Sequence, residues 1–253
     1  MRASHLTVRK RIMDEKSKIT DEEFFTSKEY RGYLADITEA ATKRYRRPIH
    51  VTVFADPEDS TVAYTDYNGI VINACNHITW SMPTRKLRSM SIEGFNAHEN
   101  SHNLFTDNRI AHAYFNSLEH GKFYPKKPTR LKGDQKLNAQ GIIDALMDDT
   151  DPIPKTVILR TAKALSNILE DGYVDARSSY EFPGNPARGI ALNNVRFAEA
   201  VPDIDTMIDK QFYPHNIVLN LLLEYVRARE VNNLTGYTGE YICLLYTSDA
   251  ADE

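Results

Sequence analysis

Residues 92–105 read IEGFNAHENSHNLF and contain the pentapeptide from His98 to His102, which fits the pattern His-Glu-x-x-His. In a helix, residues four apart lie about 40° from one another around the axis, so both imidazoles project from one face, one turn apart. Phe95 and Phe105 share that face and place the imidazoles at a packed interior. The run therefore predicts a helix that carries a pair of metal ligands.

Glu99 lies roughly 100° around the helix from His98, where it can reach a water molecule on the metal without binding the metal itself. Two neutral imidazoles and a third ligand suit Zn²⁺, whose open fourth position lowers the pKa of a water molecule to about 7. A neighbouring carboxylate can accept the proton of that water. The alternative is two surface histidines beside a solvated glutamate.

The composition is that of an ordinary globular chain. Its 253 residues are 42% hydrophobic and 26% charged, with a formal net charge of −4, and no apolar run approaches the length of a bilayer span. The N-terminus has positive charges without an apolar stretch behind them, so we expect no secretion signal, no membrane association and a cytoplasmic location. The basic segments Lys43–Arg47 and Lys126–Lys132 leave nucleic-acid binding as a weaker hypothesis, which the near-neutral charge disfavours.

The last residues, Cys243–Glu253, read CLLYTSDAADE and resemble the translation of a transposase-type sequencing adapter. We therefore expect residues 243–253 not to be native and the natural chain to continue beyond about Ile242. Without this tail only Cys75 remains, which excludes an internal disulfide.

Helical patterns dominate the chain, with few strands between them. Thr20 precedes three acids at the start of a helical pattern from about Ser17 to Tyr45. Residues 49–55 read as a strand, and residues 64–75 as a hairpin that turns at Asn68-Gly69. Further helices are expected after Asp107, at 140–147, 155–177 and 214–231. The expected class is α+β, mostly helical, with a small sheet next to the His-Glu-x-x-His helix.

A third metal ligand has to come from another segment. The helix expected over residues 155–177 has an apolar stripe, and Glu170, Asp171 and Asp175 lie beside it. Each of these acids is a candidate ligand, and the alternative is three solvated acids on a surface helix. His77 is expected to be a solvent-facing or substrate-side residue, and His112 and His120 to be core or surface residues, rather than ligands.

The two motifs HENSHNLFTD (98–107) and NILEDGYVD (167–175) resemble zincin-type metallopeptidases of bacteria and phages, which often precede a von Willebrand A-like domain. The resemblance implies a zincin-like metallopeptidase fold over residues 49–242, after an N-terminal helical segment (1–48). It implies Glu170 as the third ligand with Asp171 as the alternative, since Asp171 and Asp175 have the four-residue spacing that Glu170 lacks. Asp107 and Asp175 would then orient the ligating imidazoles.

By the same resemblance, residues 70–73 form the edge strand along which an extended peptide or protein substrate pairs, and a MoxR-type AAA+ ATPase is a partner. We predict a zinc metallopeptidase with Glu99 as general base, and Tyr173 or a histidine remains open as the group that stabilises the oxyanion. The alternative is a non-catalytic zinc-stabilised module that docks an AAA+ ATPase or another protein. A structural zinc site has no use for Glu99, which favours the enzyme.

Overall fold

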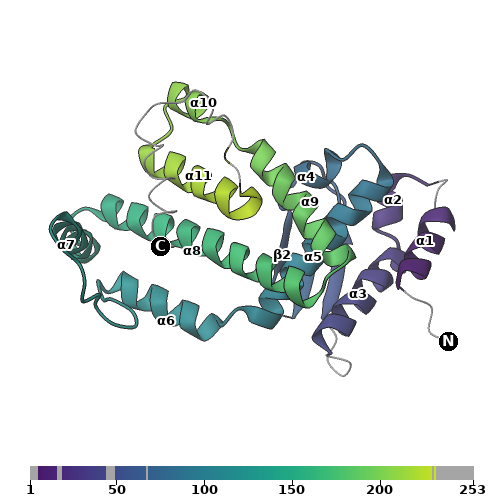
Figure 1. Ribbon diagram of the computed structural model, residues 1–253, viewed down its shortest axis with the longest axis horizontal. Helices are drawn as coiled ribbons and strands as arrows, with labels where there is room; N and C mark the ends of the chain where they lie inside the picture. The colour runs from purple at the N-terminus through teal and green to yellow at the C-terminus, as the bar shows by residue number, and fades with distance from the viewer. Residues whose placement is uncertain (1–4, 16–18, 44–48, 67, 230, 232–253) are drawn as a thin grey trace. The chain divides into compact units, whose positions relative to one another are not determined.

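The computed structural model describes residues 5–15, 19–43, 49–66, 68–229 and 231. The predicted tail, Cys243–Glu253, lies outside the described residues, as does the basic segment after Lys43. The described residues are mostly helical with one three-stranded sheet (Figure 1), so the predicted α+β class is confirmed. It forms two compact units, one of Met1–Thr106 with Asp171–Glu253 and one of Asp107–Glu170. The chain thus divides after Thr106 and after Glu170, and the boundary expected at residue 48 stays a prediction.

The sheet of the first unit contains β1 (His50–Phe54), β2 (Ala63–Thr65) and β3 (Gly69–Asn73) in the order β1-β3-β2. Strands β2 and β3 pair antiparallel, as the predicted hairpin requires, and the Asp66 carboxylate accepts the backbone N–H groups of Asn68 and Gly69 in its turn. Strand β1 pairs parallel to β3. The side chains of Ile70 and Ile72 are fully buried beneath the sheet.

The prediction that residues 70–73 form an edge strand is wrong. They belong to β3, which is the central strand because β1 occupies one of its edges and β2 the other. The hairpin pattern predicted the β2–β3 pair, but a parallel neighbour from an earlier segment leaves no local signal in the sequence. Strands β1 and β2 are therefore the edges of this sheet.

The single N-terminal helix expected from about Ser17 to Tyr45 is two helices, α2 (Asp21–Phe25) and α3 (Lys28–Thr42), preceded by α1 (His5–Glu15). The predicted start at Thr20 is confirmed as a capping box with Glu23. A second cap at Ser27, whose hydroxyl accepts the N–H of Tyr30, separates the two helices. Their apolar residues share a core with the sheet and with the helix that carries His98 and His102, including Phe24, Phe25, Leu34, Ile70, Ile92 and Phe95.

After α4 (His77–Trp80) comes the predicted metal helix, α5 (Arg85–Phe105), which Thr84 caps. It packs against α9 (Asn185–Ala200), a helix that the sequence pattern did not reveal (Figure 1). The two helices meet at glycines: a Cβ built on Gly94 would lie 2.3 Å from the carbonyl carbon of Gly189. Only glycine at both positions permits this backbone contact.

The long helix α8 (Pro152–Glu181) includes the segment with the candidate acids, and its residues from Asp171 onward belong to the first unit. That part lies beside α11 (Pro214–Ala228), which follows α10 (Ile204–Asp209). A Cβ on Gly172 would lie 2.3 Å from Cγ1 of Val226, so this glycine lets the two helices come close. The predicted helices at 155–177 and 214–231 are thus present with slightly different ends.

The second unit consists of α6 (Asn108–Glu119), α7 (Asp134–Met147) and the first part of α8. The connection between α6 and α7 is largely exposed. Throughout the described parts of both units, no helix has the length and apolar character needed to cross a membrane.

Candidate metal centre

Helix α5 presents His98 and His102 as the sequence predicted, on one face and one turn apart. Their ring centroids are 4.9 Å apart and their Nε2 atoms 3.3 Å apart. Both side chains are largely buried, with 14% and 16% of their surface exposed. The alternative of two freely solvated surface histidines does not describe them.

Asp171, on α8, completes a triangle of donor atoms. Its Oδ1 lies 3.3 Å from Nε2 of His102 and 3.7 Å from Nε2 of His98. A point equidistant from the corners of such a triangle is about 2.0 Å from each atom. This is the length of a zinc–nitrogen or zinc–oxygen bond in proteins, so the donor set fits a zinc ion.

Within the described residues, the His, Cys, Asp and Glu side chains grouped closely enough to hold a metal are His98, His102 and Asp171. Glu170, the expected third ligand, is not in the group, and its alternative Asp171 is. On one helix adjacent residues point about 100° apart, so only one of the two can face the imidazoles. Asp171 shares its face with the buried Val174, Asp175 and Ser178. The four-residue spacing of Asp171 and Asp175 was the signal for this arrangement.

The Nδ1 atoms of both imidazoles, which lie away from the triangle of donor atoms, each have a polar partner. Nδ1 of His98 lies 2.7 Å from Oδ1 of Asp175, the contact predicted for that residue, and Nδ1 of His102 lies 3.0 Å from the hydroxyl of Thr106. Because a carboxylate only accepts, Nδ1 of His98 donates and the Nε2 lone pair of the neutral ring is left for a metal.

Asp107 does not have the contact expected of it. Its carboxylate caps α6 by accepting the backbone N–H groups of Arg109 and Ile110. The neighbouring Thr106 is the residue that contacts the His102 ring. An aspartate directly before a helix is a favourable N-cap, and this local use was readable from the sequence.

Glu99 is 8% exposed and lies close enough to the site for its charge to interact with both imidazoles and with Asp171. Burial raises the pKa of its carboxyl, while His98 and His102 counteract part of that rise. A carboxylate with a raised pKa is a better proton acceptor near neutral pH than a solvated one.

The charges of the site also shift the pKa values of His98 and Asp171. Burial by itself lowers the pKa of His98, but the hydrogen bond to Asp175 and the nearby carboxylates outweigh it and raise that pKa to about 9. Burial raises the pKa of Asp171, but the opposing effects of His102, His98 and Arg227 are larger, so the pKa lies below its usual value. In the metal-free protein at neutral pH, Asp171 is therefore ionised and His98 is protonated.

Arg227, on α11, contacts this site and was not found from the sequence. Its Nη2 lies 2.6 Å from Oδ2 of Asp171, and its Nη1 lies 2.7 Å from Oδ1 of Asn194 on α9. No pattern marked either residue, because nothing local in a sequence shows that α9 and α11 pack against each other.

Tyr173, one of the groups left open for oxyanion stabilisation, lies about 160° around α8 from Asp171 and is 50% exposed. It therefore faces away from the imidazoles. His77 begins α4, is exposed as expected, and has its ring 6.2 Å from that of Phe197. His112 and His120 are exposed on the second unit, and neither is in the group that could hold a metal.

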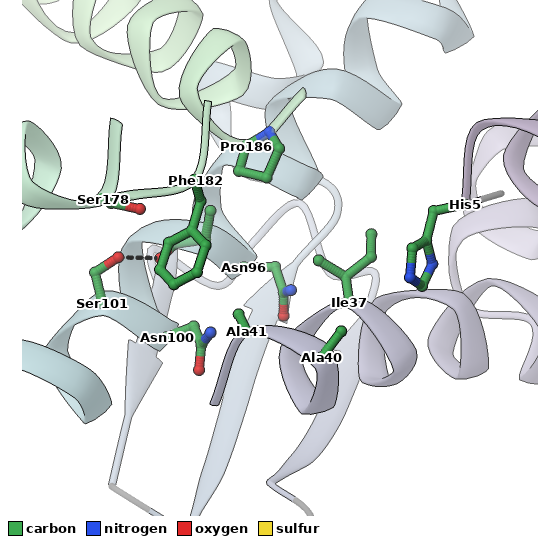
Figure 2. A pocket seen from close by; sticks show the side chains of 11 residues that line it. His5, Ile37, Ala40, Ala41, Asn96, Asn100, Ser101, Ser178, Phe182 and Pro186 are labelled. Atoms are coloured by element: carbon green, nitrogen blue, oxygen red, sulfur yellow. Dashed lines mark hydrogen bonds between the residues drawn. The ribbon is translucent and has the colours of Figure 1, made fainter. Parts of the chain in front are cut away.

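A cavity of about 210 Å³ adjoins a different face of α5 (Figure 2). Its lining is mostly apolar, and Ala97, Asn100 and Ser101 contribute from α5. The Oδ1 atom of Asn100 is buried with no hydrogen-bond partner in the described structure. The cavity includes neither the metal group nor Glu99, and its one titratable residue is His5. The chemistry of the site is thus separate from this space.

Protein-family models give no match to this chain, and neither curated proteins nor solved structures show significant similarity to it. The resemblance to zincin-type metallopeptidases therefore rests on the two sequence motifs.

Proposed function

We propose that the protein is a zinc-dependent metallohydrolase that cleaves peptide bonds. The observation that carries the proposal is the triangle of His98, His102 and Asp171, whose edges of 3.3, 3.3 and 3.7 Å suit zinc. Glu99, which a purely structural zinc site does not require, lies beside this triangle. Both features come from the segments that carry the zincin resemblance.

In this proposal each residue has one role. The three donors would hold zinc, which when bound polarises a carbonyl group and lowers the pKa of a water molecule. Glu99 accepts the proton of the attacking water and then passes it to the leaving amine. Asp175 and Thr106 keep the two imidazole rings in orientation through their Nδ1 atoms.

A peptide substrate has an edge strand available next to the metal helix. Asn103 of α5 donates from Nδ2 to the Thr65 hydroxyl of β2 at 3.1 Å, which ties the edge strand to the helix. We propose that the substrate backbone pairs with β2 rather than with residues 70–73. The zincin-like fold, a MoxR-type AAA+ ATPase as partner and a cytoplasmic location are retained as proposals that rest on the resemblance and composition alone.

The first test is metal content. Protein purified without chelators or a polyhistidine tag should contain about one zinc ion per chain by plasma mass spectrometry. His98→Ala and Asp171→Ala should lose the ion, and Glu170→Ala, which changes the adjacent acid, should keep it. Zinc lost in Glu170→Ala but kept in Asp171→Ala would restore Glu170 as the ligand, and a wild type that takes up no zinc would overturn the proposal.

The second test separates the enzyme from a zinc-stabilised binding module. Wild-type protein and Glu99→Gln should hold equal amounts of zinc, while only the wild type should hydrolyse a mixture of unstructured peptides. If Glu99→Gln cleaves at the wild-type rate, the assigned role is wrong. A zinc-loaded wild type that cleaves no peptide in the mixture would favour the binding module.

A further inference from the structure

The carboxylate of Asp171 faces two different partners with its two oxygens. Oδ1 is directed to the imidazoles, at 3.3 Å from Nε2 of His102, and Oδ2 lies 2.6 Å from Nη2 of Arg227. A carboxylate can bind a metal through one oxygen or through both. With Oδ2 engaged by a guanidinium, only Oδ1 is available to an ion at the centre of the triangle.

Arg227 is itself held firmly. Its Nη1 donates to Oδ1 of Asn194 at 2.7 Å and lies 3.7 Å from Oδ2 of Asp175, to which Asn194 also donates at 2.8 Å. The guanidinium lies 4.9 Å from the ring centroid of Phe197, and 11% of the side chain is exposed. One buried cation thus joins both aspartates of α8 to α9 through a planar fork, a geometry that lysine cannot reproduce.

The contact between Arg227 and Asp171 requires α11 to lie close to α8. Gly172 follows Asp171, and Val226 precedes Arg227, at the point where any Cβ on residue 172 would collide with the valine. The glycine therefore lets α11 come close enough for Arg227 to reach the carboxylate. The positive charge of Arg227 also suits this position, because Glu99, Asp171 and Asp175 bring three carboxylates to one buried region.

We propose that Arg227 is a positioning residue that restricts Asp171 to binding zinc through one oxygen, which keeps the metal four-coordinate and one position open. The inference rests on the proposed function, because it needs a metal at the triangle. It goes beyond the ligand set by assigning the coordination number to a residue on a different helix.

The test compares Arg227→Gln with Arg229→Gln, which removes the same charge two residues away, where the guanidinium lies 5.7 Å from the Tyr225 ring centroid. Zinc affinity is measured by chelator competition, and coordination by the visible absorption of the Co²⁺-substituted proteins. We expect Arg227→Gln to lose 10- to 100-fold in affinity and to show the weaker, shifted Co²⁺ bands of a five-coordinate ion. Arg229→Gln should match the wild type in both measurements.

Arg227→Lys keeps the charge without the fork and should also show the altered Co²⁺ spectrum; it decides the question if Arg227→Gln does not fold. An unchanged spectrum in the folded variants would overturn the inference, even with reduced affinity, because a merely structural role predicts no change in coordination. Failure of the wild type to bind zinc or Co²⁺ would instead refute the proposed function, and the inference with it.

Discussion

In the proposed zinc site, His98 would link metal binding to proton release. Its pKa of about 9 in the metal-free protein means that the ring is charged at neutral pH, whereas a zinc ligand must be a neutral imidazole. Zinc binding at pH 7.5 should therefore release about one proton per chain, and the affinity should increase with pH until about pH 9. Calorimetric titrations in buffers of different ionisation enthalpy measure this number, and a value near zero would contradict the raised pKa.

The raised pKa of His98 also makes the stability of the metal-free protein depend on pH. Since the folded-state pKa lies above the value of about 6.5 for an unperturbed histidine, the charged ring stabilises the fold fully below pH 6.5. This contribution should be lost as the pH rises through about 9. Denaturant titrations of the metal-free protein at pH 6 and pH 9.5 measure the loss, and His98→Gln should reduce it.

Asp175 and Asp107 allow a matched comparison of two aspartates that the sequence put forward for the same role. Asp175→Asn removes the charge that holds Nδ1 of His98 and should weaken zinc binding at least tenfold. Asp107→Asn preserves the N-cap of α6 and should leave zinc affinity unchanged. Chelator competition on both variants checks this, and an equal effect of the two would contradict the roles that the structure gives them.

At the scale of elements, the contact with α9 holds α5, the helix that carries His98 and His102, in place. Gly189→Ala would put a methyl group 2.5 Å from the carbonyl oxygen of Met90 and should destabilise the protein by about 1–3 kcal/mol or more. Gly32→Ala is the control, since this α3 glycine has open space and alanine favours a helix by up to about 1 kcal/mol. Denaturant unfolding of both variants should give shifts of opposite sign.

The order of the strands is an element-scale result that changes the proposed substrate path. Alternation and the Asn68-Gly69 turn were enough to predict the hairpin, because both are local. The parallel pairing of β1 with β3 joins segments across the intervening β2, and its register depends on the helices that cover the sheet. For this reason the edge that the resemblance implied at residues 70–73 was wrong, and the edges of the sheet are β1 and β2.

For the whole molecule, zinc binding should stabilise one of the two units and leave the stability of the other unchanged. His98, His102 and Asp171, the residues of the candidate metal centre, all belong to the unit of Met1–Thr106 and Asp171–Glu253. Ligand binding stabilises only the cooperative unit that contains the site, so zinc should slow amide exchange in α5 and in α8 after Asp171. Helix α7 should exchange at the same rate with and without zinc. Hydrogen-exchange mass spectrometry tests this, and equal protection of α7 would show that both units respond together.

The sequence by itself determined the α+β class, the helix that carries His98 and His102 on one face, and the helical segment that carries the acids, because helix periodicity, caps and tight turns are local. Tertiary structure decided that Asp171 and not Glu170 lies beside the imidazoles, since this depends on which side of α8 faces α5. It also assigned Thr106 to the His102 ring and brought Asn194 and Arg227 to Asp171 and Asp175. Those contacts join helices far apart in the chain, and their formation depends on packing between α5, α8, α9 and α11, which no local pattern encodes.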